Sequence, residues 1–202
     1  MPTPQRITTS LLTLAVLFVA GSLSAQSPKR TPTPAEARVG MLMNFARFTA
    51  WPRESFPDTP ETRAPIVIGF LADDEAFQTA VDAIKDNPTH TIQGRTVEFR
   101  RIDPPTEKHE TMTECAHQAA QVHVLYIGPI NRPARLTILQ TLERKPILTV
   151  SNEDRFLEDG GMIALFTERG RYRFEIRKKS LNDAGLEISS KVLELARRVI
   201  RD

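Results

Sequence analysis

The sequence predicts an α/β domain built on a three-layer, doubly wound, mostly parallel sheet that ends in a C-terminal β-hairpin and a final helix. Apolar runs of strand length, beginning with Ile66–Leu71, alternate with helix-like segments of roughly 10 to 15 residues. This alternation is typical of parallel strands joined by helical crossovers. After the last run, Met162–Phe166 and Arg171–Ile176 flank Gly170, which indicates a hairpin.

Residues 1–25 have the order of a secretory signal. Arg6 is the only charge before the apolar run Leu11–Ala20, and small residues follow that run. The run is shorter than the ~20 apolar residues of a membrane-spanning helix. We therefore expect export with cleavage after Ser24 or Ala25, and an uncleaved membrane anchor is the alternative.

The rest of the chain has the size and charge of one exported domain. Residues 26–33 contain two prolines and predict a flexible leader, and residues 34–202 are expected to form a single domain. The net charge is only +2, with acids and bases interspersed, which does not favour nucleic acid as a partner. Cys115 is the only cysteine, so no disulfide can form within the chain. A buried free thiol and an intermolecular disulfide are the two alternatives.

The expected elements of the first part of the domain follow from apolar periodicity and from turn residues. We expect helices over 35–50, 73–84, 107–120 and 133–142, and strands over 66–71, 95–102, 122–127 and 146–150. Pro34 behind Thr33 favours the start of the first helix, and Pro52 ends it. The strand over 95–102 alternates apolar and polar residues, so we expect it to be half exposed at a sheet edge.

The last part of the chain predicts a single helix after the hairpin. Its apolar face would be formed by Ile188, Val192, Leu195, Ala196 and Val199. The pairs Glu187/Lys191 and Glu194/Arg198 have the i,i+4 spacing of ion pairs on its other face.

The stretch Thr149–Ile163 is the strongest candidate for a functional loop. Its pattern predicts the end of a buried strand, a short helix capped by Ser151 and Asp154, and a turn at Gly160 and Gly161. Loops at strand ends carry the binding sites of α/β sheets. The alternative is that the stretch only connects two core strands.

The candidate partner- or ligand-binding residues lie on this loop and on the hairpin. They are Ser151, Glu153, Asp154, Gly160, Gly161, Met162, Arg173 and Glu175. Asn44, Phe45 and Trp51 form a second group, for which we expect core or dimer packing rather than ligand stacking.

No common catalytic signature is present, and no G-x-G-x-x-G follows the first strand, so we expect a binding protein without enzymatic activity or cofactor. Cys115, His117 and His123 match no strong zinc pattern, which predicts surface histidines and no metal. The acidic residues Glu153, Asp154, Glu158 and Asp159 favour capping and solvation over cation binding. The basic residues Arg171, Arg173, Arg177, Lys178 and Lys179 form either a solvated sheet face or an anion- or protein-binding face.

Two motifs resemble the YfiR family. The run TVSNEDRFLEDGGMIALF, followed by YRFEI and AGLEISSKVLELAR, resembles the C-terminal half of that family, and Met43–Pro52 resembles its first helix. The resemblance extends from about Ala35 to Arg198. The chain departs from the family at Arg177, where asparagine is expected, and in its lone cysteine, which puts redox control through a disulfide in doubt.

The resemblance implies a homodimeric periplasmic regulator. Such a protein binds the sensory part of an inner-membrane diguanylate cyclase and holds it inactive, which lowers cyclic di-GMP and biofilm formation. The alternative is a periplasmic small-molecule-binding module that serves a sensor kinase or a transporter. A cyclase gene beside this one would favour the first interpretation.

Overall fold

The computed structural model of the protein describes residues 31–71, 75–85, 91–105 and 109–201. The chain divides into two units, Met1–Thr31 and Pro32–Asp202, and every described helix and strand lies in the second. The expected signal, residues 1–25, and most of the expected leader lie outside the described residues. None of the described helices is long and apolar enough to cross a membrane.

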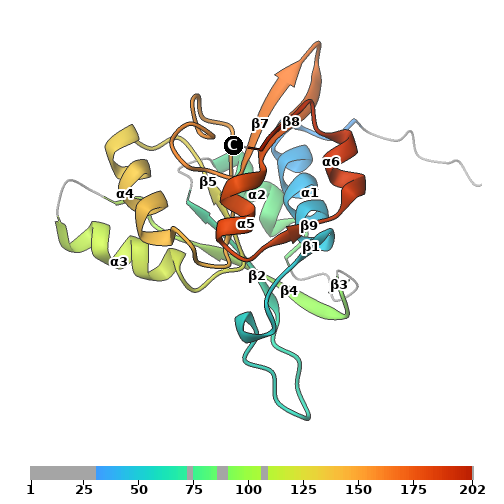
Figure 1. Ribbon diagram of the computed structural model, residues 1–202, viewed down its shortest axis with the longest axis vertical. Helices are drawn as coiled ribbons and strands as arrows, with labels where there is room; N and C mark the ends of the chain where they lie inside the picture. Colours follow the sequence, from blue (N-terminus) through green and yellow to red (C-terminus); the bar gives the residue numbers. More distant parts are fainter. Residues whose placement is uncertain (1–30, 72–74, 86–90, 106–108, 202) are drawn as a thin grey trace, which may run out of the picture. The chain divides into compact units, whose positions relative to one another are not determined.

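Eight of the described strands form one sheet with the order β10-β8-β7-β6-β5-β2-β4-β3 (Figure 1). They are β2 (Ile66–Leu71), β3 (Thr91–Ile92), β4 (Arg95–Arg101), β5 (Val124–Ile127), β6 (Leu148–Ser151), β7 (Ile163–Glu168), β8 (Arg171–Arg177) and β10 (Arg198–Ile200). Neighbours from β4 to β7 run parallel, and β10 is parallel to β8. Only the pairs β7–β8 and β3–β4 of this sheet are antiparallel. The predicted α/β class with a mostly parallel sheet is confirmed.

The described helices flank this sheet, and two short strands pair outside it. The helices are α1 (Pro34–Arg47), α2 (Glu75–Asp82), α3 (His109–Ala119), α4 (Arg132–Leu142), α5 (Lys178–Asp183) and α6 (Ser190–Leu195), with a 3₁₀ turn η1 (Arg53–Ser55). The small strands β1 (Thr49–Ala50) and β9 (Glu187–Ile188) pair antiparallel. As expected, α1 begins behind Thr33, whose side chain accepts the Glu36 N–H at 3.2 Å while the Glu36 carboxylate accepts the Thr33 N–H at 2.7 Å.

The core consists of two apolar clusters that share the strands. All six residues of β2 are buried, as its continuous apolar run predicts. Because side chains of a strand alternate in direction, Ile68 joins a cluster with α1 and α2, whereas Val67 joins a cluster with α3 and α4. Phe156 and Leu157, from the loop after β6, belong to the second cluster. This loop therefore packs where another crossover helix would lie.

The hairpin forms where the sequence predicts it. Strands β7 and β8 pair from Ile163↔Ile176 to Glu168↔Arg171, which leaves a two-residue turn. Arg169 and Gly170 both have positive φ, at 50° and 73°. Two-residue hairpin turns favour such angles because they match the twist of the flanking strands.

The predicted single final helix is wrong. The segment divides into α5, β9, α6 and β10, and α6 ends at Leu195. Instead of continuing the helix, Arg198–Ile200 pairs in parallel with Glu175–Arg177 and extends the sheet past β8. The side chain of Arg198 contacts Glu175 at 2.6 Å rather than forming the expected pair with Glu194. Backbone pairing and this charge pair thus override the helical periodicity, and Leu195 is left 70% exposed.

Candidate functional site

The loop between β6 and β7 contains no helix, contrary to the prediction. Residues 152–162 are bends and turns. Ser151 starts the first turn because its hydroxyl accepts the Glu153 N–H at 3.1 Å, and it donates to the Ile127 carbonyl at 2.6 Å. Asp154 does not complete a capping box. The sequence pattern therefore predicted the turn at Ser151 correctly, but the helix predicted after the turn is wrong. Burial of Phe156 and Leu157 fixes the loop in place of a helical hydrogen-bond ladder.

The two glycines of the loop have different roles. Gly160 has φ of 105°, a conformation that favours glycine. Gly161 has no such angle, but a Cβ built on it would lie 2.2 Å from Cε1 of Phe156. Gly161 therefore allows the backbone to approach the Phe156 ring.

A buried charge cluster connects the loop to α4. The carboxylate of Asp159 contacts Arg132 at 2.6 Å and Arg135 at 2.8 Å, and only 1% of its side chain is exposed. Arg135 is 5% exposed and also donates to the Asp154 carbonyl at 3.1 Å. Hydrogen bonding to Arg132 and then to Arg135 lowers the pKa of Asp159, against the opposing effect of burial.

The sequence interpretation missed this cluster because it grouped Asp159 with the other acids of the loop. The spacing of Arg132 and Arg135 on one helix face was the signal available. Arg132 and Arg135 precede Asp159 by 27 and 24 positions, so local sequence patterns do not connect them with the loop.

A groove of about 490 Å³ opens between the loop and the strands β7, β8 and β10. It is lined by Asn152, Glu153, Asp154, Arg155, Phe156, Leu157, Glu158, Ala164, Leu165, Phe166, Thr167, Tyr172, Glu175, Arg198 and Ile200. Register places Ala164 opposite Glu175, and Glu175 opposite Arg198, across the three strands. Three predicted site residues, Glu153, Asp154 and Glu175, thus meet around one groove.

The charges around this groove are partly paired. Arg198 contacts Glu175 at 2.6 Å, and Arg155 at the loop rim contacts Glu158 at 2.8 Å with both side chains more than 60% exposed. Arg173 lies opposite Phe166 in the hairpin and contacts Glu168 at 3.8 Å. The groove therefore combines an apolar floor that includes Phe166 and Ile200 with a rim of both charges.

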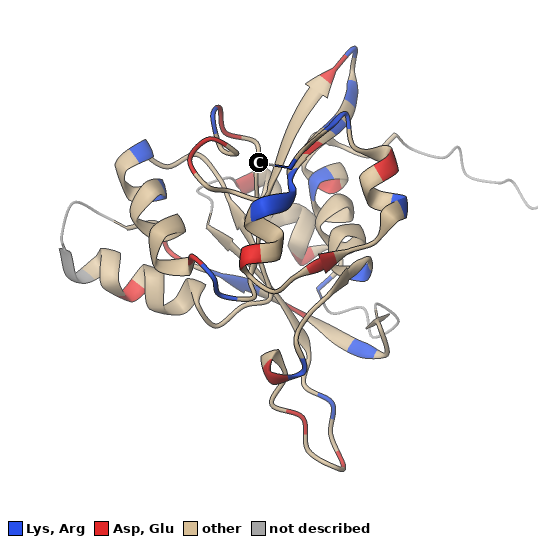
Figure 2. Ribbon diagram, in the orientation of Figure 1, with Lys and Arg blue, Asp and Glu red and all other residues tan. Residues whose placement is uncertain are grey.

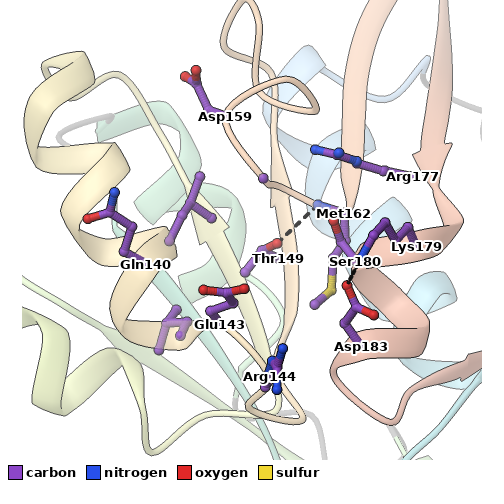
Figure 3. A pocket seen from close by; sticks show the side chains of 13 residues that line it. Gln140, Glu143, Arg144, Thr149, Asp159, Met162, Arg177, Lys179, Ser180 and Asp183 are labelled. Carbon is purple, nitrogen blue, oxygen red and sulfur yellow. Dashed lines mark hydrogen bonds and ion pairs between the residues drawn. The ribbon is translucent and has the colours of Figure 1, made fainter. Parts of the chain in front are cut away.

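The end of the loop faces a second, smaller cavity of about 210 Å³ between α4 and α5 (Figure 3). Gly160 and Met162 line it, and the Met162 N–H donates to the Thr149 hydroxyl at 3.1 Å. Asp159, Arg177 and Lys179 are among the charged side chains around it. Arg177, the position that departs from the family pattern, donates to the Leu157 carbonyl at 2.9 Å and so fixes the loop to β8.

The second predicted group lies apart from both hollows. Phe45 is 3% exposed and packs edge-on against Phe174 with ring centroids 5.1 Å apart, which makes it a core residue. Asn44 is exposed one position earlier on α1. Trp51 is partly buried and packs edge-on against His123 with ring centroids 6.1 Å apart.

His123 is not at the surface, contrary to the prediction, whereas His117 is exposed. The His123 ring is 8% exposed, accepts the Val67 N–H at Nδ1 and lies with Nε2 3.0 Å from the Ser55 carbonyl. Both bonds form together only in the neutral tautomer that carries its proton on Nε2. The described residues contain no cluster of three or more metal-ligating side chains.

Cys115 is buried in α3, and burial raises the pKa of its thiol to about 11. The thiol therefore carries little thiolate at neutral pH, which makes it a poor nucleophile.

A family model described as YfiR/HmsC-like matches residues 35–197. The chain belongs to the YfiR/HmsC-like family. The match contains the loop, both predicted groups of residues and every residue that lines the groove except Arg198 and Ile200. Members of this family are regulators rather than enzymes.

Solved structures share the fold of this YfiR/HmsC-like chain. A conserved domain protein from Vibrio cholerae O1 biovar El Tor matches with a TM-score of 0.53 at 12% identity, over 83% of this chain and 60% of that one. An ABC domain from Streptococcus pneumonia, in complex with L-Trp, matches with a TM-score of 0.51 at 17% identity, over 83% and 62%. The chain thus spans less than two thirds of either structure, and the likeness concerns the fold alone. No curated protein matches the chain.

The first testable prediction concerns the charge cluster. Asp159→Asn should lower the free energy of unfolding by about 3 kcal/mol, because the buried Arg135 loses its closer carboxylate, at 2.8 Å, and keeps only that of Glu153, at 3.6 Å. Asp154→Asn, the same change at an exposed position of the same loop, should stay within about 0.5 kcal/mol. Urea denaturation of both variants measures the difference, and equal stabilities would contradict the assigned role of Asp159.

The second prediction concerns Gly161. Gly161→Ala should destabilise the protein by about 1–3 kcal/mol, because the new methyl group overlaps the Phe156 ring. Gly40→Ala is the control: it lies within α1 with open space around its Cβ and should stabilise by about 0.5–1 kcal/mol. A Gly161→Ala protein that melts with the wild type would show that the loop does not pack as described.

The third prediction is a pH dependence. Burial lowers the pKa of His123 below its ordinary 6.5, and nearby Arg95 and Arg100 act in the same direction, against the Ser55 carbonyl. The unfolded state therefore binds the proton more readily. The stability contribution of neutral His123 is complete above pH 6.5 and is lost as the pH falls through the folded pKa.

His123→Leu should therefore be less stable than the wild type near neutral pH and should lose less stability on acidification. Melting temperatures between about pH 8 and pH 5 measure this. His117→Leu, at the exposed histidine, should keep the wild-type pH profile. Parallel profiles for His123→Leu and wild type would exclude His123 as the titrating group.

Proposed function

We propose that this protein represses an inner-membrane diguanylate cyclase by binding the cyclase's periplasmic sensory part, which lowers cyclic di-GMP and biofilm formation. The observation that carries the proposal is the family match over residues 35–197. We further propose that the chain is exported through residues 1–25, acts in the periplasm as a homodimer, and performs no catalysis.

The groove is the surface that we propose for the cyclase. An apolar floor within a charged rim is the usual anatomy of a protein interface. Six of its 15 lining residues are charged, with both signs present, which suits a protein segment better than an apolar small molecule. The loop residues Glu153 and Asp154 and the hairpin residues Arg173 and Glu175 would supply the charged contacts.

The strand order supports a finer description of the fold. The parallel strands follow the order β4-β2-β5-β6-β7, in which the chain moves outward from β2 in one direction and then in the other. We propose that the fold is therefore a doubly wound, three-layer arrangement, whose sites lie beyond the carboxyl ends of the strands. The loop that follows β6 begins at such an end.

A small-molecule-binding module that serves a sensor kinase or a transporter is the second candidate. The cavity between α4 and α5 favours it, with charged side chains such as Arg177 and Asp183 around a volume of about 210 Å³. This volume is below the roughly 300–1,000 Å³ of common ligand sites. A neighbouring cyclase gene would favour the repressor, and a neighbouring transporter gene the binding module.

The test removes charge around the groove without disturbing the fold. Arg155→Ala and Arg173→Ala should each weaken binding to the cyclase's periplasmic part by about 1–2 kcal/mol, and each should raise cellular cyclic di-GMP. Their melting temperatures should match the wild type, because both side chains are exposed. Arg53→Ala, on the distant η1 turn, is the matched control and should change neither affinity nor cyclic di-GMP. Unchanged affinity and repression in both groove variants would place the partner surface elsewhere.

A further inference from the structure

The hairpin formed by β7 and β8, with β10 beside it, carries a surplus of positive charge. Residues 163–177 and 198–200 hold five arginines against two glutamates, although the whole chain has a net charge of only +2. Lys and Arg lie at the tip and along the second strand of the hairpin (Figure 2). The charge is therefore concentrated at one place rather than spread over the molecule.

The ion pairs at the tip do not neutralise this surplus of positive charge. Glu168 contacts Arg173 at 3.8 Å and Arg197 at 3.6 Å, so one carboxylate serves two arginines. Arg169 and Arg171, next to it at the turn, are exposed and make no ion pair with the residues that the structure describes. Because the turn has only two residues and is held by the strand pairing, both guanidinium groups project from a fixed support.

An exposed apolar side chain accompanies these charges. Leu195 is 70% exposed at the end of α6, two residues before Arg197, whose N–H donates to the Phe174 carbonyl of the hairpin. A large exposed apolar residue next to several arginines is the composition of surfaces that contact the lipid headgroup region. Contact with a membrane surface would account for the exposure of Leu195 without a soluble protein partner.

The chain enters the domain at the same end. The Tyr172 hydroxyl, next to the turn, donates to the Pro34 carbonyl in the first turn of α1 at 3.2 Å. The segment before Pro34 therefore joins the domain beside the hairpin tip. That segment contains the apolar run Leu11–Ala20, which would bring this end toward the bilayer before cleavage or as an uncleaved anchor.

We propose that the hairpin tip, defined by Arg169, Arg171, Arg197 and Leu195, docks on the anionic phospholipid surface of a membrane. Guanidinium groups bind phosphate oxygens in a bidentate manner, and basic residues are attracted to anionic headgroups within about a Debye length. A lipid surface fits better than a single phosphate ligand because the arginines line a convex turn rather than a cavity. Docking would hold the groove, which adjoins the hairpin, close to a membrane-bound partner.

The experiment places a fluorescent label at the tip of the full chain. Thr167→Cys puts an exposed thiol beside the turn, and Arg53→Cys puts one on the distant η1 turn as a control. Cys115 is buried, with its thiol pKa at about 11, and should stay unlabelled. The vesicles are phosphatidylcholine alone or phosphatidylcholine with a minority of phosphatidylglycerol. The label at 167 should report an apolar environment only on the anionic vesicles, and the label at 53 on neither.

The charge requirement is tested in the same assay. Arg169→Gln/Arg171→Gln should weaken the anionic-vesicle response of the 167 label on the order of tenfold or more, and high salt should do the same. Arg47→Gln/Arg53→Gln, which removes equal charge elsewhere, should leave the response unchanged. Because the label is attached beside the turn, its response measures contact of the tip with the vesicle, and binding of the N-terminal segment to the vesicle does not by itself produce that response.

Two results would overturn the proposal. One is an equal response on neutral and anionic vesicles, and the other is no response at all. If the tip variant instead loses binding to the cyclase's periplasmic part, the arginines belong to a protein interface. Failure of the wild type to bind any cyclase would reject the proposed function but would leave the vesicle result standing.

Discussion

The contact of Asp159 with Arg132 and Arg135 determines the shape of the candidate site. Weakening the pairing of a buried charge costs several kcal/mol, so Arg135, which is 5% exposed, depends on the Asp159 carboxylate at 2.8 Å more than on that of Glu153 at 3.6 Å. The contact ties a loop without regular structure to α4 and lets Phe156 and Leu157 fill the second apolar cluster. Because the loop takes the place of a crossover helix, the faces of β7 and β8 beside it are covered only in part, and the groove opens there.

The short strand β10 completes this arrangement. It protects the outer edge of β8, which would otherwise expose unpaired backbone groups. It also brings Arg198 to Glu175 and Ile200 to the groove, so that the last residues of the domain line the same surface as the loop. The hairpin, the loop and the C-terminal strand thus meet on one side of the molecule.

The sequence alone predicts those elements whose formation depends on residues close together in the chain. The buried run Ile66–Leu71, the helix behind Thr33 and the turn at Gly170 each follow from apolar periodicity, capping or backbone freedom. Prediction from the sequence failed where contacts between residues far apart in the chain determine the structure. Arg198 pairs with Glu175 across 23 positions, and buried His123 bonds to Val67 and Ser55. For the same reason the groove could not be predicted as a surface, although Glu153, Asp154 and Glu175 were chosen individually.

The central claim is that the groove between the loop and the hairpin contacts the cyclase. The most direct measurement is amide hydrogen exchange on this protein with and without the purified periplasmic part of the partner cyclase. The account predicts slower exchange in residues 152–158 and 164–175 when the partner is added, with α3 and η1 unchanged. Protection confined to the surface around Trp51, or no protection at a partner concentration that saturates binding, would contradict it.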